Sequence, residues 1–258
     1  MTSPLGDPST PAVITGGASG IGAACAAALA AVNRPVAIWD LDAARAEQVA
    51  TRLRDDHGAQ ATAVPVDVVD DAAVTDAVAF TVAALGSIGG LVHAAGIVRG
   101  ALDDVIDADT WDGVLATHLR AYAFVTRAVF PELRGAGPGA AIVGISSIEG
   151  LVGHGFIPSY TAAKHGMIGL TRSFAHRLGP DGIRVNAVCP GYIDTPMLAP
   201  TIQTTEARAA FERRVPLGRL GEADEIARVV RFLLSNESSY LHGAAVVVDG
   251  GVTATGGQ

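Results

Sequence analysis

The sequence predicts an α/β protein: a single domain with a doubly wound, mostly parallel sheet of seven strands and helices on both faces. Three observations support this fold class. Short β-branched runs alternate along the chain with longer segments of helical periodicity. The strand-like runs are almost continuously apolar, which is typical of parallel strands covered on both sides. A glycine-rich loop at residues 15–22 joins the first strand-like run to the first helical segment.

The first half of the chain contains four predicted strands and three predicted helices. Residues 12–15 form a short apolar run, which predicts a buried strand. Residues 20–32 place apolar side chains at helical spacing, which predicts a helix. The two patterns then alternate, with strands expected at 36–39, 61–66 and 91–94, and helices expected at 43–56 and 71–85.

The second half continues the alternation with three more strands. Gly179 and Pro180 end the helix that carries Tyr160. Because no linker interrupts the pattern, residues 12–251 are expected to form one domain, preceded by a flexible segment at 1–11 and followed by a glycine-rich tail at 252–258. Strands are expected at 140–145, 184–188 and 244–248, and helices at 109–133, 159–178, 205–214 and 223–234.

Composition limits the class of protein and its partners. The chain has 258 residues, of which 49% are hydrophobic and 17% charged, and it contains 31 glycines, as expected of a compact globular protein with many tight turns. The formal net charge is −8 and the sequence pI is about 5.3. Since no basic cluster stands out, we expect neither nucleic acid nor a membrane surface as a partner, and a small molecule as the substrate.

The cysteines and the first residues favour a cytoplasmic protein. Cys25 and Cys189 lie in apolar stretches, so we expect two reduced core thiols. The histidines are scattered without ligand spacing, and we expect no metal site. Residues 1–11 lack the charged and apolar regions of a secretory signal.

Tyr160 and Lys164 have the spacing of a proton-transfer pair. They are four residues apart in a predicted helix, so they lie on one face. An unperturbed phenol has a pKa of about 10, and a neighbouring ammonium favours the phenolate. Ser147 could bring a hydroxyl to the same point and orient a carbonyl or alcohol oxygen. Taken alone, the Tyr-Lys pair is a weak signal, because ordinary helix surfaces also carry it.

The glycine-rich loop predicts a binding site for a dinucleotide. Its glycines permit a tight turn and close approach of a phosphate, and the following helix offers free N–H groups to a pyrophosphate. The loop residues expected to contact the cofactor are Gly16, Ser19, Gly20, Ile21 and Gly22.

Asp40 and Leu41 favour NAD over NADP. Asp40 ends the second predicted strand, 24 residues after Gly16. A carboxylate there can accept hydrogen bonds from the adenosine ribose and would repel a 2′-phosphate, and no arginine follows to offset the repulsion. The alternative is that Asp40 caps the helix that opens after Asp42.

Asp67 and Val68 end the third predicted strand. There an aspartate side chain and a backbone N–H could bind adenine. A helix cap at Asp67 or Asp70 is the alternative, and the local sequence supports it almost as well.

With these features in place, the chain resembles the short-chain dehydrogenase/reductase family in its single-domain form with a Rossmann-type sheet. The resemblance extends from Ala12 to Gly251. It rests on the joint occurrence of several motifs, namely the loop at 15–22, Asp67, Ala94-Ala95-Gly96, Ser147, Tyr160 with Lys164, Arg184-Val185-Asn186, the segment 190–196 and Asp249-Gly250-Gly251.

The resemblance implies roles for the matching residues. Tyr160 is expected to be the general acid/base, Lys164 to bind the nicotinamide ribose and lower the tyrosine pKa, and Ser147 to hydrogen-bond the substrate oxygen. The expected activity is hydride transfer between NAD and a secondary alcohol or ketone. Further residues expected to line the cofactor are Ala94, Ala95, Gly96, Pro190, Gly191, Ile193 and Thr195.

Two positions depart from the family pattern. The family has Asn-Asn-Ala-Gly where this chain has His93-Ala94-Ala95-Gly96, and it has asparagine where this chain has His118. In the family that asparagine holds a water that relays protons to the lysine. Histidine can also donate and accept, so His118 is expected to keep the relay. The alternative is a core histidine bonded to a backbone carbonyl.

The loop after Thr195 predicts a mainly apolar or cyclic substrate. Met197 and Leu198 are expected to close over it, as this region does in the family. Glu149, His154 and Tyr192 flank the expected site and either orient a polar group of the substrate or serve the structure.

The family also commonly pairs the helices expected at 109–133 and 159–178 between subunits, which implies a homotetramer. Two alternative functions stay open at this point. One is a ketoacyl reductase acting on an acyl carrier protein, and the other is a catalytically silent NAD-binding sensor or scaffold.

Overall fold

One parallel sheet of seven strands organises the protein. The computed structural model describes residues 5, 7–99 and 107–254. The strand order is β3-β2-β1-β4-β5-β6-β9, and all six pairings are parallel. This confirms the predicted doubly wound sheet, whose order reverses between β1 and β4. The strands are β1 (Ala12–Thr15), β2 (Val36–Asp40), β3 (Ala61–Pro65), β4 (Gly90–His93), β5 (Ala141–Ile145), β6 (Arg184–Pro190) and β9 (Ala245–Val248).

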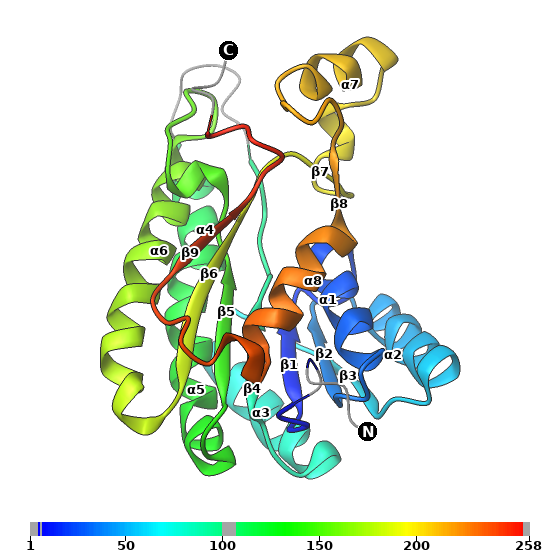
Figure 1. Cartoon of the computed structure of the whole chain (residues 1–258), viewed down its shortest axis with the longest axis vertical. Coiled ribbons are helices and arrows are strands. Elements are labelled where there is room, and N and C mark those ends of the chain that lie inside the picture. The colour runs from blue at the N-terminus through cyan, green and yellow to red at the C-terminus, as the bar shows by residue number, and fades with distance from the viewer. Residues whose placement is uncertain (1–4, 6, 100–106, 255–258) are drawn as a thin grey trace.

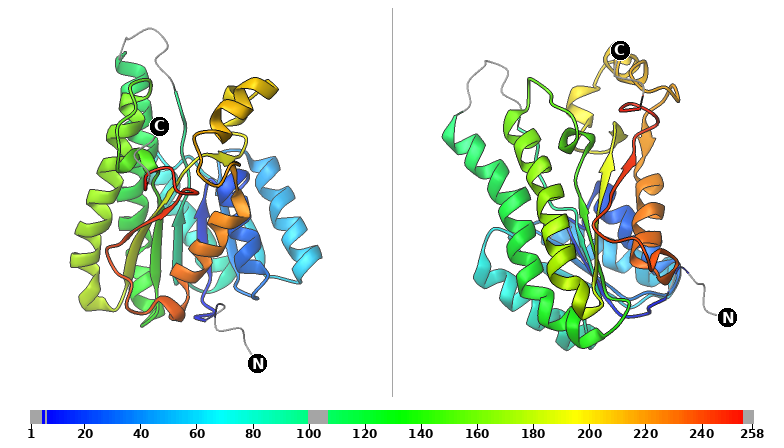
Figure 2. Two further views of the ribbon diagram at one scale, coloured as in Figure 1. Left: turned by 45° about the horizontal axis from the view of Figure 1, so that its top comes forward. Right: turned by 60° about the vertical axis from the view of Figure 1, so that its left-hand side comes forward.

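Helices cover both faces of this sheet (Figure 1). The helices α1, α2 and α8 lie on one face, while α3, α4, α5 and α6 lie on the other, as the side views also show (Figure 2). The bounds are α1 (Gly20–Ala30), α2 (Ala43–His57), α3 (Asp71–Leu85), α4 (Ala108–Leu115), α5 (Ala121–Ala136), α6 (Pro158–Leu178), α7 (Thr205–Glu212) and α8 (Ala223–Leu234).

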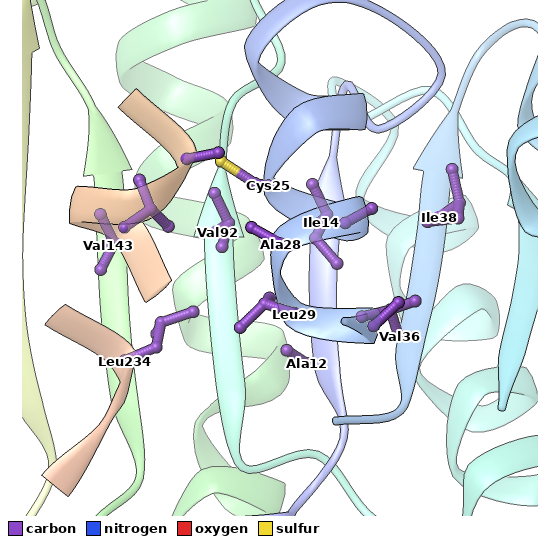
Figure 3. Close-up of a cluster of buried hydrophobic side chains, with 14 of the residues drawn as sticks. Ala12, Ile14, Cys25, Ala28, Leu29, Val36, Ile38, Val92, Val143 and Leu234 are labelled. Atoms are coloured by element: carbon purple, nitrogen blue, oxygen red, sulfur yellow. The ribbon is translucent and has the colours of Figure 1, made fainter. Parts of the chain in front are cut away.

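The core on the α1 side is built from small residues on the helix and β-branched residues on the strands. Cys25 and Leu29 of α1 pack over Ile14 and Val92 of the sheet, and Leu234 of α8 closes the layer (Figure 3). Because α1 is mostly alanine and glycine, α8 can pack closely against it. Both cysteines, Cys25 here and Cys189 in a second cluster, are buried and free, which confirms the predicted core thiols.

The prediction of one long helix at 109–133 was wrong in its centre. A π-helical segment, Ala116–Arg120, separates α4 from α5 and contains His118. A π turn adds one residue, so apolar periodicity continues on both sides of it and gives no signal at the junction. The other predicted helix and strand boundaries agree with the structure within three residues.

A short parallel ladder and α7 extend beyond the carboxyl ends of the strands (Figure 1). The ladder pairs β7 (Ile193–Asp194) with β8 (Gly221–Glu222). Arg208 of α7 contacts Asp194 at 2.6 Å and joins this helix to the ladder. The sequence analysis did not predict the ladder, because two-residue strands carry no periodicity.

Two buried arginines hold the C-terminal end of α8 near the amino ends of the strands, where Arg184 begins β6. Arg184 donates to the carbonyl oxygens of Leu233 and Ser235, and Arg34 donates to that of Leu234. These carbonyls lack partners within the helix, so the arginines satisfy its C-terminus. The Arg184 position of the family motif therefore has a structural role here. Among the described residues, no helix is long and apolar enough to cross a bilayer.

Candidate active site

The glycine-rich loop leaves the N-terminus of α1 open at the carboxyl end of β1. Gly16 has φ +65°, and a Cβ at Gly22 would overlap the carbonyl oxygen of Gly16, so both positions require glycine. The Ser19 side chain makes no capping bond, and the first turn of α1 contains no acidic residue. The free N–H groups and positive end of α1 therefore fit a pyrophosphate.

Asp40 lies beside this loop with acceptor capacity to spare. Its Oδ2 accepts from the Ala18 N–H at 2.9 Å and its Oδ1 from the Asp42 N–H at 3.0 Å. The cap of α2 is Asp42, which accepts from the Arg45 N–H, so the alternative role of Asp40 as that cap was wrong. A carboxylate has roughly four acceptor positions, so Asp40 can still accept from a ribose.

Asp67 does not cap α3 either. The N-cap is Asp70, which accepts from the N–H groups of Ala72 and Ala73, while Asp67 stays exposed and accepts from the Val69 N–H. Val68 is buried against the sheet. Asp67 is thus available to a ligand at the end of β3.

Thr15 joins the glycine loop to the turn after β4. Its hydroxyl oxygen lies 3.2 Å from the N–H nitrogens of Ala94 and Ala95, and it accepts from both. Its own hydrogen therefore goes to Nδ1 of His93, at 3.1 Å, which leaves the His93 proton on Nε2. Burial lowers the pKa of His93 to about 3, so the ring is neutral. The sequence analysis missed Thr15, because its partners depend on the pairing of β1 with β4.

Ser147, Tyr160 and Lys164 meet beyond the carboxyl end of β5. Ser147 follows that strand and caps the short turn 148–150 by accepting from the Glu149 N–H at 3.1 Å. Tyr160 and Lys164 occupy successive turns of α6. Lys164 Nζ donates to the carbonyl oxygen of Ile145 at 2.7 Å and lies 5.2 Å from the centre of the Tyr160 ring. A hydroxyl, a phenol and an amine thus converge on one point.

Burial dominates the proton affinities of this cluster. It raises the pKa of Tyr160 to about 12, although the Ser147 hydroxyl acts in the opposite direction. It also lowers the pKa of Lys164 to about 7. Lys164 was expected to lower the tyrosine pKa. In this structure the amine is bonded to Ile145 instead, and the buried phenol stays protonated at neutral pH.

His118 contacts both the backbone and the ring of Tyr160. Its Nε2 lies 2.7 Å from the carbonyl oxygen and 3.1 Å from the backbone nitrogen of Ile97, so it is bonded to the backbone, as the structural alternative predicts. Its ring also meets the Tyr160 ring edge-on, with centres 5.2 Å apart. Nδ1 is buried and has no hydrogen-bond partner among the described residues, so it can still take part in a relay.

The segment after β6 faces the glycine loop. A Cβ at Gly191 would lie 2.9 Å from Cα of Asp249, so this turn packs directly on the terminal Asp-Gly-Gly motif. The Thr195 side chain would lie 3.6 Å from a Cβ at Gly20. Pro190, Gly191, Ile193 and Thr195 therefore run from the end of β6 to the start of α1, where a dinucleotide would cross.

An apolar wall borders the catalytic cluster. Ile148, next to Ser147, packs with Val215 and Val252, and Tyr192 covers them. Tyr192 also meets Phe211 of α7 edge-on, with ring centres 5.0 Å apart. Tyr192 is thus a wall residue that holds α7 near the site.

The other expected substrate residues lie at different depths. Met197 is 45% exposed and Leu198 is half-buried, both where the chain leaves Thr195 for α7. His154 is half-buried in the loop before α6, beside Phe156. Glu149 is buried in the turn 148–150 that Ser147 caps.

Comparison with known proteins decides the family. The model of the family described as enoyl-(acyl carrier protein) reductase matches residues 16–253. Cis-4-hydroxycyclohexanecarboxylate dehydrogenase of Sinomonas cyclohexanicum is 42% identical over 245 residues, which are 94% of this chain and 96% of the relative. The chain belongs to the short-chain dehydrogenase/reductase family. It is accordingly an oxidoreductase that acts on CH–OH groups.

Other members of this short-chain dehydrogenase/reductase family show its breadth. The 3-oxoacyl-(acyl-carrier-protein) reductase FabG of Thermotoga maritima is 36% identical, over 93% of this chain and 96% of the relative. The crystal structure of a putative 2-deoxy-d-gluconate 3-dehydrogenase from Agrobacterium tumefaciens with bound NADP matches with a TM-score of 0.88 at 35% identity. That match covers 98% of this chain and 99% of the other. The family uses a nicotinamide cofactor, and the loop, Asp40 and the free end of α1 fit one.

Proposed function

We propose that this protein is an NAD-dependent dehydrogenase of a cyclic, largely apolar secondary alcohol. The observation that carries the proposal is the convergence of Ser147, Tyr160 and Lys164 beyond β5, beside the open N-terminus of α1. The apolar wall of Ile148, Val215 and Val252 supports an apolar substrate. The hydroxycyclohexane substrate named for the Sinomonas relative supports a cyclic one.

The side chains divide the work of alcohol oxidation. The Ser147 hydroxyl hydrogen-bonds the substrate oxygen, and the Tyr160 phenolate takes its proton. Lys164 would hold the nicotinamide ribose, and His118 would exchange the proton through its buried Nδ1, which has no hydrogen-bond partner among the described residues. Held beside Lys164, NAD⁺ would supply the hydride acceptor for the carbinol carbon and a positive charge near the phenol. That charge and a protonated Lys164 oppose the effect of burial on the phenol.

The proposed preference for NAD rests on charge at the end of β2. Asp40 carries a carboxylate at the expected ribose position, and the next residue, Leu41, is 76% exposed and uncharged. A 2′-phosphate there would meet a negative charge, and Asp40 forms no salt bridge with the described residues that would neutralise it. Asp40→Ser should raise the kcat/KM for NADP and lower that for NAD, so that their ratio changes by about 100-fold. A ratio that stays constant would contradict this reading of Asp40.

Turnover with a matched mutant tests the proposed activity. NADH formation is measured with NAD over cyclohexanols, cyclic diols and cis-4-hydroxycyclohexanecarboxylate. Tyr160→Phe should lower kcat by at least about 100-fold while NADH still binds, because only the acid/base group is removed. Undiminished turnover in Tyr160→Phe would refute the assignment.

Two other functions are compatible with the family and differ in their predictions. The FabG relatives make a ketoacyl reductase the second candidate. Such a reductase would use NADPH and would bind an acidic carrier protein through basic residues. This chain has a net charge of −8 and no basic cluster in its sequence, which disfavours that partner. A silent NAD-binding sensor would bind NADH and turn over no alcohol in the panel.

We also propose a homotetramer that uses the outer faces of α4, α5 and α6. These helices border an open apolar hollow of about 750 Å³. Phe124 projects there between Arg120 and Arg127, each 4.4 Å from its ring centre, and Gly166 and Gly169 keep the α6 side flat. Phe124→Asp should place a charge in the contact and reduce the mass found by light scattering to that of a dimer or monomer. A wild-type protein that is monomeric at micromolar concentration would contradict the assembly.

A further inference from the structure

Glu149 is a buried acid built into the catalytic cluster. It lies two residues after Ser147, in the turn 148–150, and its backbone N–H donates to the Ser147 hydroxyl oxygen at 3.1 Å. Its Oε2 accepts from the hydroxyl of Thr161 at 3.2 Å, and Thr161 directly follows Tyr160. The backbone of Glu149 is thus bonded to Ser147, its carboxylate is bonded to the first turn of α6 that carries Tyr160, and the residue is 7% exposed.

The carboxylate of Glu149 has unused capacity as an acceptor. Among the described residues it accepts one side-chain hydrogen bond, from Thr161, and it forms no salt bridge. A carboxylate can accept roughly four hydrogen bonds. Burial raises its pKa, and the nearby rings of His154 and His165 act in the opposite direction without bonding to it. A buried acid left with so few partners is typical of a site that binds a ligand.

The position of Glu149 determines which part of a substrate it can reach. The Glu149 side chain is held between the turn that follows Ser147 and the helix turn that carries Tyr160, and its negative charge adds to the effect of burial in raising the pKa of Tyr160. A substrate oxygen held by Ser147 and Tyr160 would therefore place its neighbouring carbon near the free oxygen of Glu149. On that carbon an apolar substituent forms no hydrogen bond with Glu149, whereas a hydroxyl can donate one to the free carboxylate oxygen. A carboxylate substituent is repelled by the negative charge of Glu149.

We propose that Glu149 selects substrates with a hydroxyl on the carbon next to the carbinol, and that it disfavours a carboxylate at that position. The inference rests on the proposed alcohol dehydrogenase function and specifies its substrate class as cyclic vicinal diols. A carboxylate on the far side of the ring would lie away from Glu149. The selection is a property of one side chain, so one substitution can remove it.

The test compares three substrates of similar shape in matched variants. The kcat/KM is measured for cyclohexane-1,2-diol, cyclohexanol and 2-hydroxycyclohexanecarboxylate with the wild type, Glu149→Gln and Glu149→Met. Glu237→Gln serves as the control, since Glu237 is exposed in the turn after α8, at the opposite end of the sheet. The diol-to-cyclohexanol ratio should fall about 10-fold in Glu149→Gln and about 100-fold in Glu149→Met. The carboxylate-to-cyclohexanol ratio should rise about 10-fold in Glu149→Gln.

The outcomes separate a selective role from a structural one. Opposite changes for the diol and the carboxylate support the proposal, because lost packing would lower all three substrates together. The proposal is overturned if the Glu149 variants lose kcat/KM equally for all three substrates. It is also overturned if their substrate ratios match those of Glu237→Gln. If the wild type oxidises none of the alcohols, the proposed function fails. The role of Glu149 is then tested by calorimetry, which measures the binding of the diol and of cyclohexanol to the NADH complex. If the wild type prefers the diol and Glu149→Met does not, diol selection by Glu149 is supported. If the wild type binds both alcohols equally, diol selection by Glu149 is overturned.

Discussion

Lys164 provides the sharpest test of the electrostatics of the site. Burial lowers its pKa from 10.5 to about 7, while Nζ donates to the Ile145 carbonyl oxygen and to the Met167 sulfur and contacts the Tyr160 ring. The folded protein therefore releases a proton that the unfolded chain retains over this pH range. Lys164→Met removes the amine and keeps an unbranched chain that can fill the same space.

The sign and size of the effect follow from linkage. Since the folded pKa lies below the unfolded value, the lysine destabilises the fold fully below pH 7, and this cost disappears as the pH rises through 10.5. Between these two pKa values the free energy of unfolding of the wild type rises by about 1.4 kcal/mol per pH unit relative to that of the variant. From pH 7 to pH 10 the stability of the wild type should therefore increase by roughly 3 kcal/mol relative to Lys164→Met. The lost bond to Ile145 costs the variant about 1–3 kcal/mol at every pH, and it cancels in this comparison.

Two measurements check this reasoning. Urea unfolding of both proteins at pH 7 and pH 10, at equal protein concentration, gives the change in the stability difference. Lys164 is also the one lysine in the sequence, so protein labelled with ¹³C at lysine Cε gives one resonance whose titration reports its pKa directly. A midpoint near 10.5, together with a stability difference that is constant with pH, would refute the claim that burial controls this amine.

Two further predictions concern the glycine loop and the thiols. Gly22→Ala should abolish NADH binding, measured by fluorescence titration, because its Cβ would overlap the Gly16 carbonyl oxygen; Gly135→Ala, where the backbone is helical and a Cβ meets nothing within 4 Å, is the control at a glycine outside the site. Burial raises the pKa of both Cys25 and Cys189, so the native protein should not react with Ellman's reagent at pH 8, while the unfolded chain should release two equivalents. Stoichiometric labelling of the native protein would contradict the buried thiols.

Local patterns in the sequence were sufficient for the sheet and for much of the site. Seven apolar runs predicted seven strands, because a strand covered on both faces needs apolar residues at nearly every position. The glycine loop was recognisable because backbone geometry at Gly16 and Gly22 excludes side chains. Tyr160 and Lys164 were paired correctly because helical spacing alone puts positions i and i+4 on one face.

Where two explanations fitted one residue, hydrogen bonds in the structure separated them. The helix caps are Asp42 and Asp70, so Asp40 and Asp67 are left for a ligand. Neighbouring aspartates look alike in sequence, and which one caps a helix depends on where its first turn begins.

The sequence by itself thus determined the α/β fold class, the glycine loop and the pairing of Tyr160 with Lys164, since each depends on residues close together in the chain. Only the tertiary structure decided their environment. The bond from Thr15 to His93 and the contact of Glu149 with Thr161 join distant segments, and the pKa shifts of Tyr160 and Lys164 come from burial by the whole fold. Desolvation depends on everything packed around a group, so no local pattern contains it.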